Sequence, residues 1–99
     1  MDERQKGYLF RGHVYNMALD HYGFDNQLIV AVEELSEAQK EICKFFRCEG
    51  NVDHIAEEVA DAFIVLEQVE RIFGIRDKVT RYMEKKTLRL AQDIQADKE

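Results

Sequence analysis

The sequence contains no proline and no tryptophan, and only five of its 99 residues are glycine. Because proline and glycine interrupt helices most strongly, few positions force a helix to end. The most helix-favouring residues, among them Glu, Ala, Leu, Lys, Gln and Arg, are abundant. The composition therefore predicts an all-α protein, and the length predicts a single domain over residues 1–99 with one modest core.

No run of 18 apolar residues is present, and Met1-Asp2-Glu3-Arg4 lacks the apolar segment of a secretion signal. We therefore expect a cytoplasmic protein with no membrane partner. The two cysteines, Cys43 and Cys48, form no CxxC or Cys/His zinc pattern, so they are expected to be reduced thiols.

Basic residues are outnumbered by acidic ones, 14 to 20, and the acidic excess lies in one segment. Between Glu33 and Asp61 there are nine acidic and three basic residues, whereas the rest of the chain is balanced. This segment would repel nucleic acid, so no nucleic-acid partner is expected. It would also repel a nucleotide unless metal ions stood between the two.

Apolar periodicity predicts four helices and no strands. Their expected ranges are about 5–22, 26–47, 54–73 and from 75 towards 94, with residues 95–99 frayed. Gly23 and Gly74 are expected to end the first and third helices. Asp25 or Asn26 is expected to cap the second, and Asp53 the third. The short connections predict a four-helix antiparallel bundle.

The helix expected over residues 54–73 is apolar almost all round. Its apolar positions are Ile55, Val59, Ala62, Phe63, Ile64, Val65, Leu66, Val69, Ile72 and Phe73. Such a helix needs cover on several sides, more than three partner helices of one small chain provide. We therefore expect a homodimer with this helix near the interface, which could pair further into a dimer of dimers.

Two acidic patches each contain a pair of acids three residues apart. Glu34 and Glu37 belong to EELSE, and Glu58 and Asp61 belong to EEVAD. In helices, each pair lies on one face. The first patch alone could be a solvated face paired with nearby lysines. Glu58, however, falls inside an apolar sector that offers no base except His54, and such an acid is costly unless it is paired or binds a cation.

The ligand types that are missing narrow the choice of metal. No histidine follows an acid by three positions, so the Glu-x-x-His motif of di-iron bundles is absent, and no EF-hand loop is present. All-oxygen ligation suits magnesium, manganese or calcium. We expect magnesium, with manganese able to replace it. On these grounds Glu58 and Asp61 are expected to be metal ligands.

The order Glu34-x-x-Glu37, twenty further residues, then Glu58-x-x-Asp61 resembles a known metal-binding signature. It is that of the all-α nucleoside triphosphate pyrophosphohydrolases, the MazG-like superfamily, which includes dimeric dUTPases and dCTP pyrophosphatases. The resemblance covers roughly residues 25–94. It implies that Glu34, Glu37, Glu58 and Asp61 hold magnesium against an NTP or dNTP, and that a metal-activated water releases pyrophosphate and the nucleoside monophosphate. Glu34 and Glu37 are the implied catalytic residues, with Glu37 orienting the water.

The last helix, whose Val79, Met83 and Leu90 are expected to face inward, carries Lys86-Thr87-Leu88-Arg89. This resembles a K-x-x-R pattern of the same family, so Lys86 and Arg89 are candidate ligands of the substrate phosphates. The alternative is a solvated basic face. Four residues without a supporting motif are considered for base recognition: Tyr15, Asn16, His21 and Gln27.

Two other functions fit the same sequence. A regulatory helical bundle could bind nucleotide and metal without turnover. Alternatively, a plain helical interaction protein could carry the acids as a solvated face. Nucleotide binding without product would indicate the first, and indifference to magnesium would indicate the second.

Overall fold

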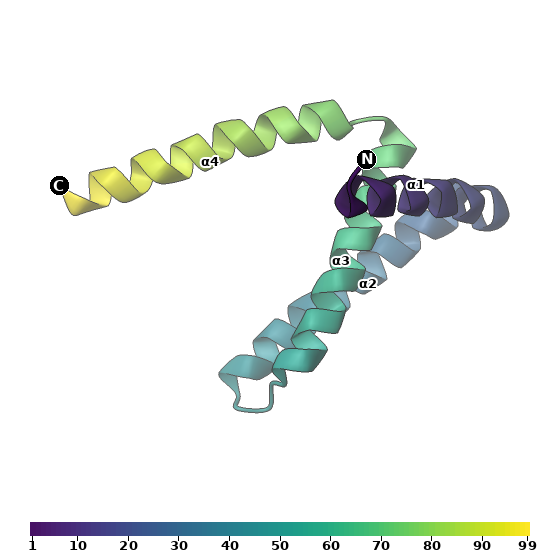
Figure 1. The fold of residues 1–99 in the computed structure, drawn as a ribbon. Coiled ribbons are helices and arrows are strands. Elements are labelled where there is room, and N and C mark those ends of the chain that lie inside the picture. Colours follow the sequence, from purple (N-terminus) through teal and green to yellow (C-terminus); the bar gives the residue numbers. More distant parts are fainter.

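The computed structural model of residues 1–99 contains four helices and no strand, which confirms the all-α prediction (Figure 1). The helices are α1 (Glu3–Tyr22), α2 (Phe24–Phe46), α3 (Val52–Phe73) and α4 (Arg76–Lys98). None of the four combines the length and the apolar character that a membrane span requires.

All four helices extend beyond a predicted end, and α2 does so by beginning at Phe24. α1 begins at Glu3 because Asp2 and Gln5 form a capping box, in which each side chain accepts from the other's backbone N–H at 2.8–2.9 Å. α3 begins at Val52 because its N-cap is Asn51, not Asp53 as predicted. The Asn51 side chain accepts from the N–H of Asp53 at 2.9 Å. α4 is helical as far as Lys98, so residues 95–98 are not frayed.

Gly23 and Gly74 end α1 and α3, as predicted. Both have positive φ, 88° and 63°, a region that glycine enters without the steric cost of a Cβ atom. Gly23 also precedes α2 directly as its N-cap, so the predicted caps Asp25 and Asn26 are wrong. The Asn26 side chain donates instead to the carbonyl of Tyr22 at 2.9 Å.

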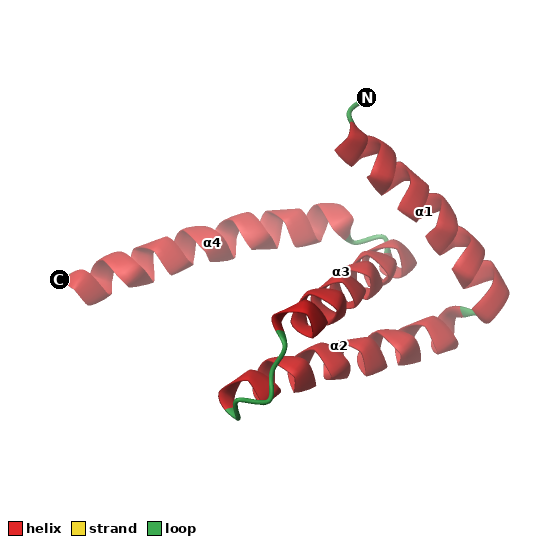
Figure 2. Cartoon of the chain, turned by 60° about the horizontal axis from the view of Figure 1, so that its bottom comes forward, coloured by secondary structure: helices red, strands yellow, loops and turns green.

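α2 and α3 form the central unit, an antiparallel hairpin whose helices lie side by side (Figure 1, Figure 2). Its core is small, with Ala31 of α2 and Val65 of α3 only 4% and 3% exposed. Next to this core the Gln68 side chain donates to the buried Gln27 side chain at 2.8 Å. This bond pairs polar groups that would be costly to bury alone.

α1 is attached to the hairpin through Glu67 of α3. Arg11 donates to both carboxylate oxygens, at 2.7 and 3.1 Å, and the hydroxyl of the buried Tyr15 donates to Oε1 at 2.7 Å. A bidentate arginine–carboxylate pair is among the stronger polar contacts in proteins. Hydrogen bonding, first from Arg11 and then from Tyr15, lowers the pKa of Glu67.

α4 leaves the end of α3 and points away from the hairpin (Figure 1, Figure 2). None of its residues is buried. Met83 and Leu90, predicted to face inward, are 63% and 58% exposed, because no helix of the same chain covers them. The four helices therefore do not close around one core within a single chain.

The open arrangement leaves a large surface. The chain exposes 8183 Å², whereas a compact monomer of 11.7 kDa exposes about 5,900 Å². Its radius of gyration is 16.6 Å, against about 13 Å for a compact chain of this length. Phe46 and Phe63 are 80% and 66% exposed. The single chain thus leaves much of its apolar surface without cover.

Removing the Tyr15 hydroxyl tests the attachment of α1. Tyr15→Phe deletes a hydrogen bond to a charged carboxylate, so we expect the free energy of unfolding to fall by about 1–2 kcal/mol in urea denaturation. Tyr22→Phe is the matched control, because Tyr22 lies on the same helix but is exposed. Equal losses in the two variants would contradict the assignment.

The same pair of variants has a pH signature. Burial, reinforced by the hydrogen bond to Glu67, raises the pKa of Tyr15 to about 12 from its ordinary value of 10.0. With a raised pKa, the stability that Tyr15 contributes is fully present below pH 10 and is lost as pH rises towards 12. The stability difference between wild type and Tyr15→Phe should therefore shrink only in that range.

Candidate metal centre

Three acids from two helices converge within the α2–α3 hairpin. Glu34 of α2 and Glu58 and Asp61 of α3 each bring one carboxylate oxygen within 4.8 Å of the others. Glu58 and Asp61 share a face of α3 because they are one turn apart, and the antiparallel pairing sets Glu34 opposite them. The structure thus brings together three of the four predicted ligands, which we name the acid cluster.

Glu58 has the least favourable surroundings in the acid cluster. Its side chain is half-buried, and its Oε2 atom is inaccessible to solvent and has no hydrogen-bond donor. It is the only buried side-chain nitrogen or oxygen in the chain without a partner. A buried carboxylate oxygen without a donor is costly, so this atom has the character of a metal ligand.

The acids also disfavour one another's charge. Desolvation, followed by repulsion from Asp61 and Glu34, raises the pKa of Glu58. Desolvation and repulsion from Asp61 likewise raise the pKa of Glu34. Both effects act against the ionised form, and a bound cation would reverse the second directly.

Glu37 lies beside the acid cluster rather than within it. Its charge contributes to the raised pKa of both Glu34 and Glu58. However, its side chain is exposed, and none of its oxygens belongs to the group that lies within 4.8 Å. Glu41, one turn further along α2, is paired with Lys44 at 3.1 Å. Of these two outer acids, Glu37 is therefore the one without a cation partner in the chain.

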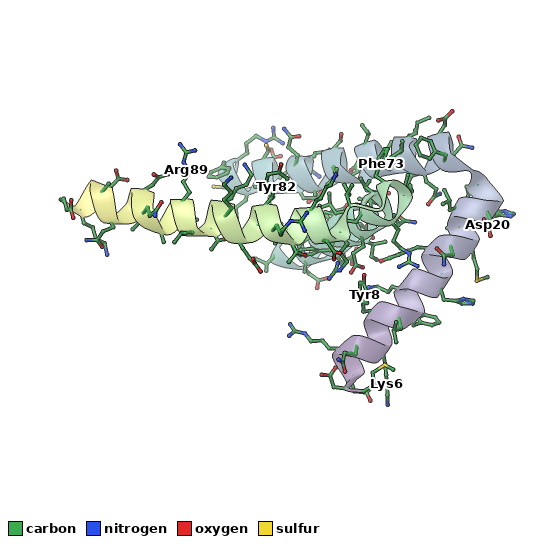
Figure 3. All side chains as sticks on the ribbon, turned by 90° about the horizontal axis from the view of Figure 1, so that it is seen from above. Lys6, Tyr8, Asp20, Phe73, Tyr82 and Arg89 are labelled. Carbon is green, nitrogen blue, oxygen red and sulfur yellow. The ribbon has the colours of Figure 1, made fainter.

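Lys86 and Arg89 are not brought to the acid cluster within one chain. Both lie on α4, which leads away from the hairpin, and Figure 3 shows Arg89 extending outward from that helix. The physical reason is the direction in which α4 leaves α3, which local sequence does not specify. In a single chain, Lys86 and Arg89 therefore do not face the same phosphate groups as the acid cluster.

Two of the residues considered for base recognition are used by the fold instead. Tyr15 donates to Glu67, and Gln27 accepts from Gln68. The other two, Asn16 and His21, are exposed on α1. Asn16 nevertheless accepts from Arg71 at 3.4 Å and, with Tyr15, lines a polar cavity between α1 and α3.

The sequence did not predict a polar cavity of about 330 Å³ at the junction of α1, α3 and α4. Two of its acidic side chains are paired with arginines: Glu67 with Arg11, and Glu70 with Arg76 at 3.5 Å. The Arg76 guanidinium also lies 4.6 Å from the centroid of the Tyr8 ring. These pairs attach the helices to each other. No local signal in the sequence could reveal the Arg11–Glu67 pair, because these two residues are 56 positions apart.

Glu58→Gln tests the electrostatic state of the acid cluster without metal. Because the pKa of Glu58 is raised, its favourable contribution is present below its ordinary value of 4.5 and is lost as pH rises. We therefore expect Glu58→Gln to raise the Tm of chelator-treated protein at pH 7.5 and to change it little at pH 4. Glu57→Gln, an exposed neighbour, is the control. A lower Tm for Glu58→Gln at pH 7.5 would contradict the argument.

The donor set fits a hard divalent cation. The acid cluster offers carboxylate oxygens only, on two packed helices, and no histidine or cysteine joins it. Such a set suits magnesium or manganese, which leave further positions to water and phosphate oxygens. Comparison of the chain with protein-family models, with curated proteins and with solved structures finds no match in any of the three.

Proposed function

We propose that the protein is a magnesium-dependent nucleoside triphosphate pyrophosphohydrolase of the MazG-like kind. The observation that carries the proposal is the buried Oε2 of Glu58, which has no donor and lies beside Glu34 and Asp61. A carboxylate in this position is unfavourable unless a cation completes it. The resemblance of the four acids to the family's metal signature gives the substrate class, an NTP or dNTP.

The acids take separate roles in this proposal. Glu34, Glu58 and Asp61 would hold the ion. Magnesium bound there would lower the pKa of a water and neutralise charge that develops on the phosphate oxygens. Glu37, exposed beside the acid cluster, orients the attacking water and accepts its proton. Attack at the α-phosphorus forms one P–O bond and breaks the bond to the bridging oxygen, so pyrophosphate leaves.

A homodimer would give the chain the core that it lacks alone. The excess over a compact monomer is about 2,300 Å² per chain, or about 4,600 Å² for two. That area is within the range of obligate homodimer interfaces. Phe63 and Leu66 of α3 are 66% and 45% exposed, which supports an interface near that helix. The dimer could pair further into a dimer of dimers.

Pyrophosphate release is the direct test of the activity. With magnesium, the wild-type protein should release pyrophosphate from at least one member of a full NTP and dNTP panel. Glu58→Gln and Asp61→Asn should lower the rate at least about 100-fold, since each removes a metal ligand. Glu57→Gln should retain the wild-type rate, and circular dichroism should show that all variants are helical. No release from any nucleotide would reject the proposal.

Calorimetry separates catalysis from the regulatory alternative. Tight nucleotide binding by the wild type without product would favour a non-catalytic bundle. In both cases magnesium should raise the Tm of the wild type but not of Glu58→Gln, because an ion that binds only the folded state stabilises it. A Tm that is indifferent to magnesium would favour the plain interaction protein.

The oligomeric state can be measured independently of activity. We expect sedimentation velocity to show a dimer at micromolar concentration, and Phe63→Asp to shift it towards monomer because it places a charge in the proposed interface. Lys6→Asp, exposed at the start of α1, is the control. A single species of 11.7 kDa for the wild type would contradict the dimer.

A further inference from the structure

We propose that α4 is exchanged between two copies of the chain. In this arrangement α4 of one copy lies along the α2–α3 hairpin of the second copy, and it brings Lys86 to the second copy's acid cluster. The role of Lys86 as a phosphate ligand rests on the proposed function. The exchange itself rests on packing, charge and register.

α4 has an apolar face that no other helix of the chain covers. Met83, Leu90 and Ile94 share one side of the helix and are 63%, 58% and 49% exposed. No residue of α4 is buried. Helices in proteins owe most of their stability to packing of such a face, so α4 requires a partner surface.

The chain's own hairpin is not that surface, because contacts at the start of α4 direct it away. The α3–α4 connection turns at Gly74 in a left-handed conformation. The first residue of α4, Arg76, is then held by Glu70 at 3.5 Å and by the Tyr8 ring at 4.6 Å. With its first turn fixed in this way, α4 extends outward (Figure 1, Figure 3). The hairpin of a second copy offers a surface that is apolar in part and opposite in charge to α4.

Lys86 lies at the edge of this apolar face of α4, beside Val79 and Leu90. At 100° per residue it falls within about 40° of both Val79 and Leu90, whereas Lys85 points about 100° further round. A lysine on a face that becomes covered is costly unless it meets an acid. Glu58 of α3 is an acid that lacks a partner, because its Oε2 is buried without a donor.

α4 and the acidic segment of the hairpin are also complementary in charge. Residues 76–89 contain six basic and two acidic residues, whereas residues 33–61 contain nine acidic and three basic ones. Opposite potentials on two surfaces favour their association and fix the register. The two segments are distant in the single chain, so their attraction is available to a second copy.

α4 and α2 also match in length, which sets the register between them. α2 and α4 are both 23 residues long, and Glu34 and Lys86 are each the eleventh residue of their helix. Two helices of equal length in full overlap bring these positions to within about 3 Å along the axis, whether they run parallel or antiparallel. Full overlap of α4 with the second copy's α2 therefore sets Lys86 level with the acid cluster. Exchange of identical elements is an established low-cost route to dimers.

Disulfide cross-linking tests the exchange without using activity. In a Cys43→Ser, Cys48→Ser background, a chain carrying Glu37→Cys and Lys86→Cys should form cross-linked dimers on oxidation. The disulfide requires Cα atoms about 4.4–6.8 Å apart, which the exchange provides between copies. A chain with Lys85→Cys in place of Lys86→Cys is the matched control and should cross-link at least about tenfold less, since its side chain points elsewhere. Cross-links formed only within one chain, or none, would overturn the exchange.

Complementation tests the role of Lys86 in the site. Glu58→Gln and Lys86→Glu should each abolish pyrophosphate release. After unfolding and refolding together, an exchanged heterodimer contains one site with both residues intact, so an equal mixture should regain roughly a quarter of wild-type activity. No recovery, or full activity of Lys86→Glu alone, would overturn this role. Interchain cross-links without activity in the wild type would reject the proposed function and retain the exchange.

Discussion

The packing of α2 against α3 determines where the other features of this protein lie. The contact is small at its centre, with Ala31 and Val65 as its buried apolar residues. It is nevertheless the only extensive contact between helices in the chain. Because the helices are antiparallel, Glu34 of one meets Glu58 and Asp61 of the other. The packing that stabilises the hairpin thus also removes a carboxylate from water and surrounds it with like charge.

Without a bound cation, repulsion and desolvation of the acid cluster oppose the packing of α2 against α3, the most extensive helix contact in the chain. Glu58 has no donor for Oε2, while Glu67, nine residues further along α3, accepts three hydrogen bonds. The contrast separates an acid that holds helices together from one whose buried oxygen has no partner in the chain. Burial and charge, rather than acidity of the sequence, distinguish the two.

The open arrangement of the chain leaves α4 and several large apolar side chains without a packing partner. α4 has no buried residue, and large apolar side chains such as Phe46 and Phe63 face solvent. A 99-residue chain with four long helices can bury them only against neighbours, and in one copy only α2 and α3 lie along each other. A second copy would cover this surface and would also supply bases to the acids. The proposed exchange of α4 would thus link assembly to the proposed function.

Local residues determined the number of helices, their approximate ranges and the glycines that end them, because helix propensity, apolar period and positive φ act over a few positions. They also determined that Glu58 and Asp61 share a face. Tertiary structure alone decided that Glu34 joins them while Glu37 stays outside, that Glu67 anchors α1, and that α4 points outward. These outcomes depend on contacts between residues far apart in the sequence, about which periodicity along a single helix carries no information.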